Sequence, residues 1–368
     1  MKILHISGAN GWGGNEQQII TIIPELNKMG VINIVLGIEN SELSKRCSIN
    51  NIDFLNVKGS KLNKYINYKY LKFLTEDIKP DLIHLHTSDS LTFYTVSDIL
   101  FKLKIKTIFS KKGMGASGSF LSKFKYNYPG ITSIFCVSKT VEKDFAKILT
   151  FKNKTKTTVI HDSVAINILN SVGDVNLREK YRIDKKHFII GNIANHSRAK
   201  DIKSFINVVD YLVNDLNRKD VVFFQIGGFS KLSNEYFEFL KGKNLDGKII
   251  FTDKIKDAYS LNPQFDLFLL TSQREGGPTS VLEAMLIGVP IVSTNVGVIP
   301  EAITDGENGF ISSVKDYKDL AIKIELLLND IELKDKFIKN SKLKILSEFV
   351  TTTIAKQTKS EYEKVLLL

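Results

Sequence analysis

Two glutamates eight residues apart enclose a glycine-rich stretch in the second half of the chain. Residues 275–283 read EGGPTSVLE and follow the apolar run DLFLLTS. The apolar run predicts a buried strand, and Pro278 is typical of the first turn of a helix, which we expect to end at Gly288. The glycine pair lets a ligand approach the backbone, and the free N–H groups of a helix start attract an anion such as phosphate. We therefore expect an anion-binding site at this strand-to-helix junction.

The two carboxylates are better suited to hydroxyl groups than to the anion itself. Glu275 precedes the expected helix and Glu283 lies within it. A carboxylate only accepts hydrogen bonds, so each side chain suits a hydroxyl on either side of a bound phosphate. A nucleotide-sugar, with its ribose, diphosphate and sugar, has that arrangement. On their own, two glutamates at this spacing are equally compatible with a solvated loop residue and an exposed helix residue.

The longer string around these residues carries a family resemblance. EGGPTSVLEAMLIGVPIVSTNVGVIPEAITDGENGFI resembles the signature region of the retaining glycosyltransferases of family 4, which have the GT-B fold. The order E-G-x-P, a second glutamate, E-A-M, G-x-P, a glycine turn, P-E and D-G-x-N-G is matched throughout. The resemblance implies a nucleotide-diphosphate sugar as donor substrate, with Glu283 on the ribose hydroxyls and Glu275 on the donor sugar.

Three further segments are similar to landmarks of the same family. GANGWGGNEQQ resembles its glycine-rich loop, which implies that Gly13 and Gly14 lie close to the diphosphate. GNIANHSRAKD resembles the segment that carries cations to the diphosphate; Lys200 matches in position, and Arg198 lies one residue from the usual place. A transferase needs such cations because negative charge builds up on the diphosphate as the sugar leaves. The remaining implied donor contacts are the helix-start residues Gly276, Gly277, Pro278, Thr279 and Ser280, and the backbone of Ile255 and Lys256.

The chain departs from the family pattern at two positions. Lys112, in TIFSKKGMG, stands where the family commonly has a histidine that reaches the donor sugar. A lysine can donate to a hydroxyl or a phosphate there, but it is no base near neutral pH without a large fall in its pKa. Asp162 and Ser163 replace the usual Asn-Gly. Lys112 is included among the catalytic candidates with Glu275, Lys200 and Arg198.

Short apolar runs alternate with helical patterns along the chain, and this alternation predicts parallel sheets covered on both faces. The pattern pauses at residues 166–187 and then restarts with FIIGNIA. We expect an α/β protein of GT-B type, with two doubly wound Rossmann-like domains facing across a cleft. The expected acceptor-binding domain is 1–170, joined by a returning C-terminal helix at 352–368, and the expected donor-binding domain is 171–351.

The positive charge is concentrated in one segment. Residues 102–156 contain thirteen lysines against Glu142 and Asp144, within a chain of net charge +11. A solvated lysine-rich surface and a footprint for a polyanion are both compatible with this pattern. The interleaved aromatic residues favour an anionic membrane surface over nucleic acid, for which no recognisable motif is present.

Several classes of protein find no support in the sequence. The two cysteines, Cys47 and Cys136, form no C-x-x-C pair, and the six histidines show no metal-ligand spacing, so neither a metal site nor a cofactor is expected. Neither a signal peptide nor a membrane span is predicted, which favours a cytoplasmic enzyme, peripheral on the inner face of the membrane.

The leading hypothesis is a retaining, metal-independent glycosyltransferase. The resemblance implies transfer of a sugar to an acceptor hydroxyl, and the basic first domain suits a lipid-linked or oligosaccharide acceptor in bacterial envelope polysaccharide assembly. The alternatives are a sugar-nucleotide epimerase or a phosphorylase on the same fold, and a polyanion-binding protein, because a fold does not fix a function.

Overall fold

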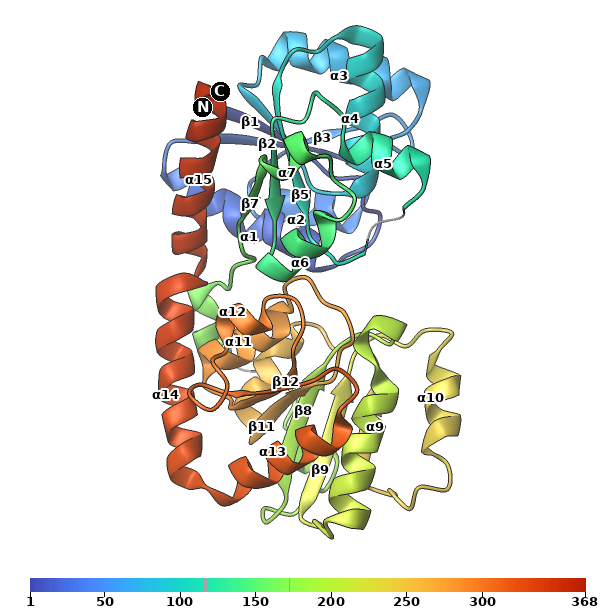
Figure 1. Cartoon of the computed structure of the whole chain (residues 1–368), viewed down its shortest axis with the longest axis vertical. Helices are drawn as coiled ribbons and strands as arrows, with labels where there is room; N and C mark the ends of the chain where they lie inside the picture. The colour runs from blue at the N-terminus through green and yellow to red at the C-terminus, as the bar shows by residue number, and fades with distance from the viewer. Residues whose placement is uncertain (116–117, 172) are drawn as a thin grey trace. The chain divides into compact units, whose positions relative to one another are not determined.

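The chain folds into two compact units, each with its own parallel sheet (Figure 1). The computed structural model describes residues 1–115, 118–171 and 173–368. The first unit contains Met1–Ser163 and Val350–Leu368, and the second contains Val164–Phe349. Two parallel α/β domains were predicted from the alternation of strands and helices, and this prediction is confirmed.

The first unit is built on a sheet whose order, in the described residues, is β3-β2-β1-β4-β5-β6-β7. All the paired strands run parallel, so their carboxyl ends share one edge, and the order reverses between β1 and β4. The strands are β1 (Lys2–Ile6), β2 (Ile32–Gly37), β3 (Asp53–Asn56), β4 (Leu82–Leu85), β5 (Lys106–Lys111), β6 (Ser133–Cys136) and β7 (Thr157–Val159).

Helices cover both faces of this sheet, as a continuously apolar parallel sheet requires. Helix α4 begins at a capping box in which the side chain of Thr87 accepts from the backbone of Ser90 and the side chain of Ser90 accepts from the backbone of Thr87. The helices of this unit are α1 (Gly14–Lys28), α2 (Glu42–Ile49), α3 (Tyr65–Ile78), α4 (Ser88–Phe101), α5 (Phe120–Tyr126), α6 (Lys139–Phe145), α7 (Phe151–Lys154) and α15 (Thr351–Leu367).

Helix α15, the last of the chain, belongs to the first unit and packs along α1 (Figure 1). Its buried residues Ile354 and Val365 join the core around the sheet residues Ile3 and Leu82. The hydroxyl of its Tyr362 lies 2.6 Å from Nδ1 of His84 on β4. The expected return of the C-terminal helix to the N-terminal domain is therefore confirmed.

The second unit has its own parallel sheet, whose order in the described residues is β10-β9-β8-β11-β12-β13. The order reverses between β8 and β11. The strands are β8 (Phe188–Ile193), β9 (Val221–Ile226), β10 (Ile249–Thr252), β11 (Leu267–Leu270), β12 (Ile291–Thr294) and β13 (Phe310–Ser312). The helical segments are η1 (Ile166–Asn170), α8 (Leu177–Lys180), η2 (Arg198–Lys200), α9 (Ile202–Asp210), η3 (Tyr211–Asp215), α10 (Ser233–Leu240), η4 (Ala258–Gln264), α11 (Thr279–Ile287), α12 (Ile299–Ala302), α13 (Tyr317–Asn329) and α14 (Ile331–Glu348).

Helix α11 has the ends that its sequence predicts. It starts directly after Pro278 and stops at Gly288, which adopts a φ of 101°. Only glycine enters that left-handed region without strain, and the side chain of Lys342 on α14 fills the space where a Cβ would lie. The helix is buried on most sides by strands and by α14, which fixes its start at the carboxyl edge of the sheet.

None of the helices in the described part of the chain combines the length and apolar character needed to cross a bilayer. The lysine-rich segment, of which residues 116 and 117 lie outside the description, divides into buried and exposed cations. Lys111 is buried and donates to the carbonyl groups of Gly113 and Gly115, and Lys125 reaches Ser88. The exposed lysines of the segment are Lys102, Lys104, Lys123, Lys139, Lys143, Lys147, Lys152 and Lys154.

Candidate functional site

The predicted donor-site residues of the second unit come from loops at the carboxyl edge of its sheet. Lys200 follows β8, Glu275 follows β11, and the loop 295–298 follows β12. β8 and β11 are the neighbouring strands at which the strand order of this sheet reverses. This is the position at which open parallel sheets bind ligands.

Lys200 and Glu275 form an ion pair in this position. Nζ of Lys200 lies 2.6 Å from Oε1 of Glu275, and the same oxygen accepts a hydrogen bond of 2.6 Å from the hydroxyl of Ser272. The lysine and glutamate side chains are only 24% and 10% exposed. Among the described residues no hydrogen bond uses Oε2 of Glu275, so one oxygen of an oriented carboxylate is left to accept a ligand hydroxyl.

The loops that carry this pair are tied to each other. The backbone N–H of Gln273 donates to the carbonyl of Ala199 at 2.7 Å, and its side chain donates to Asp201 at 2.8 Å. The hydroxyl of Thr294, at the end of β12, donates to the carbonyl of Ser272 at 2.7 Å. A site held in this way on three strands keeps its geometry without a ligand.

The glycine pair lies just before α11, with Gly276 buried and Gly277 partly exposed. Pro278 precedes the helix, and no side chain caps the N–H groups that follow it. On the other side, the loop after β12 approaches so closely that a Cβ on Gly297 would lie 2.4 Å from the carbonyl oxygen of Gly276. Gly297 has a φ of 54° and was not among the predicted site residues, although the glycine turn after this strand was noted.

Glu283 lies one turn into α11, and no described residue forms a hydrogen bond or an ion pair with its carboxyl group. Burial raises the pKa of Glu283 to about 8, although part of the side chain remains exposed. A buried carboxyl group without a partner is unfavourable, and such groups are concentrated at functional sites. Glu283 is therefore available for polar groups of a ligand.

Other predicted residues of the second unit lie farther from this pair. Arg198 is exposed, and the pKa of Glu235 on α10 is lowered by Lys203 and, to a smaller extent, by Arg198. Ile255 and Lys256 follow the edge strand β10, with Lys256 exposed. The structure groups Lys200, Glu275 and the α11 start, and it places Arg198 toward α10.

The first unit has a loop-to-helix junction of its own, at the strand reversal between β1 and β4. Gly13 and Gly14 form the start of α1, immediately after the loop that follows β1. A Cβ on Gly14 would meet no atom within 4 Å, so the backbone faces open space here. Glu16 in the first turn is buried, and its burial raises its pKa. This carboxyl group was not predicted, although its place in the first turn of a helix after a strand is visible in GGNEQQ.

Lys112 pairs with the other residue that departs from the family pattern. Its Nζ lies 2.5 Å from Oδ1 of Asp162, and the two side chains are 16% and 6% exposed. The carboxylate therefore fixes the ammonium group and offsets its charge. Sequence reasoning noted both departures but did not connect two residues so far apart in the chain.

Three histidines converge beside this pair, although their sequence spacing indicated no metal site. Potential ligand atoms of His5, His84 and His86 all lie within 4.8 Å of one another. His5 and His84 face each other in the register of β1 and β4, and burial lowers the pKa of all three, that of His5 to about 4. Neutral imidazole is the metal-binding form, but both ring nitrogens of His5 and of His84 are occupied by hydrogen bonds, and so is Nε2 of His86, which lies 2.9 Å from Nδ1 of His5.

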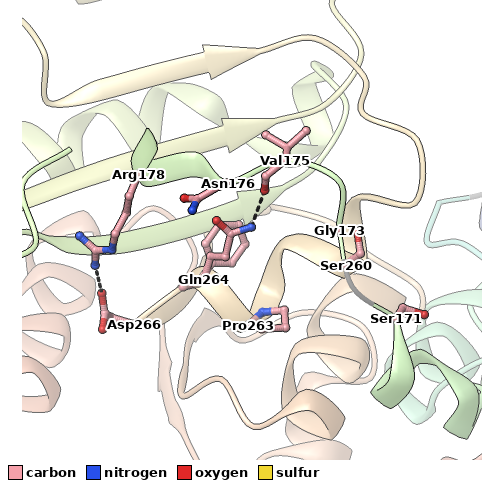
Figure 2. A pocket seen from close by; sticks show the side chains of 10 residues that line it. Ser171, Gly173, Val175, Asn176, Arg178, Ser260, Pro263, Gln264 and Asp266 are labelled. Atoms are coloured by element: carbon pink, nitrogen blue, oxygen red, sulfur yellow. Dashed lines mark hydrogen bonds and ion pairs between the residues drawn. The ribbon is translucent and has the colours of Figure 1, made fainter. Parts of the chain in front are cut away.

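A hollow of about 520 Å³ lies elsewhere in the second unit (Figure 2). The residues that line it include Gly173, Val175, Asn176 and Arg178 from one segment and Ser260, Pro263, Gln264 and Asp266 from another. Arg178 points to Asp266, 3.5 Å away, and the side chain of Gln264 donates to the carbonyl of Val175 at 2.7 Å. Since Asp266 directly precedes β11, this hollow is at the amino edge of the sheet, away from the Lys200–Glu275 pair.

Comparison with known proteins identifies relatives of both the sequence and the fold. The chain is 26% identical over 190 residues to N-acetyl-alpha-D-glucosaminyl L-malate synthase of Bacillus anthracis, a match that covers 52% of this chain and 49% of the relative. The chain thus spans about half the length of that relative. It is 20% identical over 314 residues, 82% of each chain, to the O-antigen biosynthesis glycosyltransferase WclY of Escherichia coli.

The fold is similar to that of solved GT-B glycosyltransferases. The crystal structure of Anabaena HepE in complex with UDP and glucose superposes with a TM-score of 0.81 at 18% identity, covering 99% of this chain and 100% of that chain. The sequence match to a family model lies within the second unit, which holds the Lys200–Glu275 pair and Glu283. Residues 174–344 match the family Glycosyl transferases group 1.

Proposed function

We propose that the protein is a retaining glycosyltransferase that takes its sugar from a nucleoside diphosphate sugar bound by the second unit. The observation that carries this proposal is the grouping at one strand reversal of an ion-paired Lys200 and Glu275 with an unpartnered Glu283. The glycine-rich start of α11 lies between the two glutamates. A cation, open N–H groups and two acceptors match a ligand with a diphosphate between hydroxyl-bearing rings.

The roles of the residues follow from their contacts. Glu283 accepts from the ribose hydroxyls, and the free oxygen of Glu275 accepts from a hydroxyl of the donor sugar. Lys200 keeps two N–H donors beyond its bond to Glu275, and these meet the diphosphate. The Gly276–Gly277 backbone and the amide groups at the helix start complete the anion site.

In the proposed reaction the bond between the anomeric carbon and the diphosphate oxygen breaks. The acceptor hydroxyl forms a new bond to the same face of that carbon, and its proton passes to the leaving diphosphate. Lys200 stabilises the negative charge that develops on the diphosphate, so its contribution is larger in the transition state than in the bound substrate. No residue is needed as a nucleophile, and the proposed route uses no metal.

The proposed acceptor is a lipid-linked or oligosaccharide hydroxyl in envelope polysaccharide assembly, at the inner face of the cytoplasmic membrane. The similarity to an O-antigen biosynthesis glycosyltransferase over 82% of the chain supports a glycan acceptor. The B. anthracis relative is named as an L-malate synthase, so a small soluble acceptor is the alternative. The UDP in the Anabaena structure makes a uridine nucleotide the first donor to test.

The proposal is tested by binding and turnover of nucleotide-sugars. Thermal shift with uridine, guanosine and adenosine diphosphate sugars should identify a donor, because a ligand raises the apparent stability with ln(1 + [L]/Kd). Glu283→Gln should raise the Kd for the nucleotide. Lys200→Met should lower kcat by about 100-fold or more with a smaller change in KM.

Matched controls come from an ion pair of the same unit. Lys203 and Glu235 are 2.5 Å apart on α9 and α10, and Lys203→Met and Glu235→Gln remove the same groups there. They should leave binding and turnover unchanged. Unaltered kinetics in both site variants would refute the assignment, and release of an epimerised nucleotide-sugar instead of free nucleoside diphosphate would identify an epimerase.

A further inference from the structure

Helix α5 exposes three large apolar side chains on one face. Phe120, Leu121 and Phe124 are 81%, 76% and 49% exposed, and their i, i+1, i+4 spacing places them side by side. Tyr126 of the same helix points the other way and is buried. Neighbouring apolar side chains that remain in water mark an interaction surface, whereas single exposed ones do not.

Helix α7 begins next to the C-terminal end of α5. The side chain of Asn127, at the end of α5, accepts from the backbone of Thr150 at 2.7 Å and donates to the carbonyl of Ile148 at 3.0 Å. These bonds hold the first residue of α7, Phe151, near the C-terminal end of α5, and Phe151 is 85% exposed. We name this region the α5–α7 surface; it consists of Phe120, Leu121, Phe124 and Phe151 with Lys123, Lys152 and Lys154.

The charge around the apolar side chains is positive. Lys123, Lys152 and Lys154 are exposed on the same two helices. The only acidic residues between 102 and 156 are Glu142 and Asp144. Asp144 already accepts hydrogen bonds from a backbone amide and from a lysine, and these bonds, the backbone one first, hold its pKa below the usual range. The surface is therefore complementary to an anionic partner.

We propose that the α5–α7 surface binds the interface of an anionic lipid bilayer. Phenyl and leucyl groups enter the boundary between headgroups and acyl chains, and the lysines contact the phosphates of the lipids. A second copy of the chain would bring like charges together. A nucleic acid would be bound by the lysines alone, without a reason to expose Phe120, Leu121 and Phe151. The inference rests on the proposed function in one respect: membrane binding would bring the enzyme to a lipid-linked acceptor.

The test is sedimentation of the full chain with vesicles of phosphatidylcholine, alone or with about one third phosphatidylglycerol. We expect partitioning into the anionic vesicles that weakens strongly at high salt, where charge attraction is screened. F120S/L121S/F124S should lower the partition coefficient by about tenfold or more, because each of the three substitutions removes an apolar side chain that would be buried in the bilayer. K123Q/K152Q/K154Q should lower it by about fivefold per lysine.

The matched control lies in the other unit. I331S/L343S/L346S removes three apolar side chains of α14, which are 74%, 58% and 44% exposed, and it should leave partitioning unchanged. Thermal unfolding of each variant verifies that it is folded. As a second measurement, Phe124→Trp should show fluorescence quenching by brominated lipid beyond that of Trp12, the one tryptophan of the chain.

Each outcome decides the question. Absence of the wild-type chain from anionic vesicles, or unchanged partitioning of F120S/L121S/F124S, overturns the proposal. The proposal is also overturned if only K123Q/K152Q/K154Q loses vesicle binding and the wild-type chain binds an oligonucleotide as well as it binds the vesicles. The surface would then bind polyanions in general. The vesicle assay contains no nucleotide-sugar, so a negative result there does not bear on the proposed transferase activity. That activity is measured separately, as hydrolysis of the donor by the same variants.

Discussion

Replacing Glu283 by glutamine should change how the stability of the second unit depends on pH. The carboxyl group has no described partner, and its burial raises its pKa from 4.5 to about 8. Below pH 4.5 both the folded and the unfolded chain bind this proton, so the group does not affect folding. Between pH 4.5 and 8 the unfolded chain releases the proton while the folded chain keeps it, so the wild type loses stability as the pH rises.

The size of the effect follows from the shift. Each pH unit in this window corresponds to about 1.4 kcal/mol, so the full shift amounts to about 5 kcal/mol. This value is an upper limit because part of the side chain remains exposed to solvent. In a unit of this size, 1 kcal/mol shifts Tm by about 2–4 °C, so the variant should gain up to about 10–20 °C on the wild type between pH 5 and 9.

Calorimetry of both proteins at matched pH measures this difference. The transition of the second unit is followed, since a chain with two units need not unfold in one step. Glu235→Gln, which alters an exposed carboxylate, is the control and should show no such trend. A Tm difference between Glu283→Gln and wild type that stays constant from pH 5 to 9 would mean that the carboxyl group is hydrated. That result would refute the assignment of Glu283 as a buried hydrogen-bond acceptor for a ligand.

Three further predictions concern other parts of the molecule. Asp162→Ala should destabilise the first unit by about 3 kcal/mol because it leaves the ammonium of Lys112 nearly buried without a partner, and the apolar double variant K112M/D162L should recover most of this in denaturant titrations. His5→Asn should reduce the acid sensitivity of the first unit: the folded-state pKa of about 4 lies below 6.5, so stability is lost as the pH falls from 6.5 to 4, by about 3 kcal/mol, and an unchanged acid profile would contradict this. Gly297→Ala should destabilise the second unit by about 1–3 kcal/mol and weaken nucleotide binding, because a Cβ would clash with the carbonyl of Gly276; calorimetry and nucleotide titration measure both effects.

The sequence predicts local features of the donor region well because they depend on neighbours in the chain. Pro278 and Gly288 limit the conformations of their own backbone, and α11 begins and ends at them. The apolar run before Glu275 becomes the buried strand β11, and parallel topology then places its loop at the ligand edge.

Contacts between distant segments could not be predicted in the same way. The pairing of His5 with His84 depends on the register of β1 against β4, and the bond between Lys112 and Asp162 joins the ends of strands far apart in the chain. In the sequence, the aromatic residues between 120 and 128 are all interleaved with lysines in the same way, and nothing distinguishes buried from exposed ones. Only packing decides that Tyr126 enters the core while Phe120 and Phe124 remain in water.

The location of α15 has a consequence for biosynthesis. During translation the second unit emerges from the ribosome before residues 350–368. Those residues nevertheless supply Ile354, Tyr362 and Val365 to the core of the first unit, around Ile3 and Leu82. The domain that is translated first is thus the last to be completed. Until then its nascent sheet exposes an apolar strip, and we expect it to depend on chaperones longer than its neighbour does.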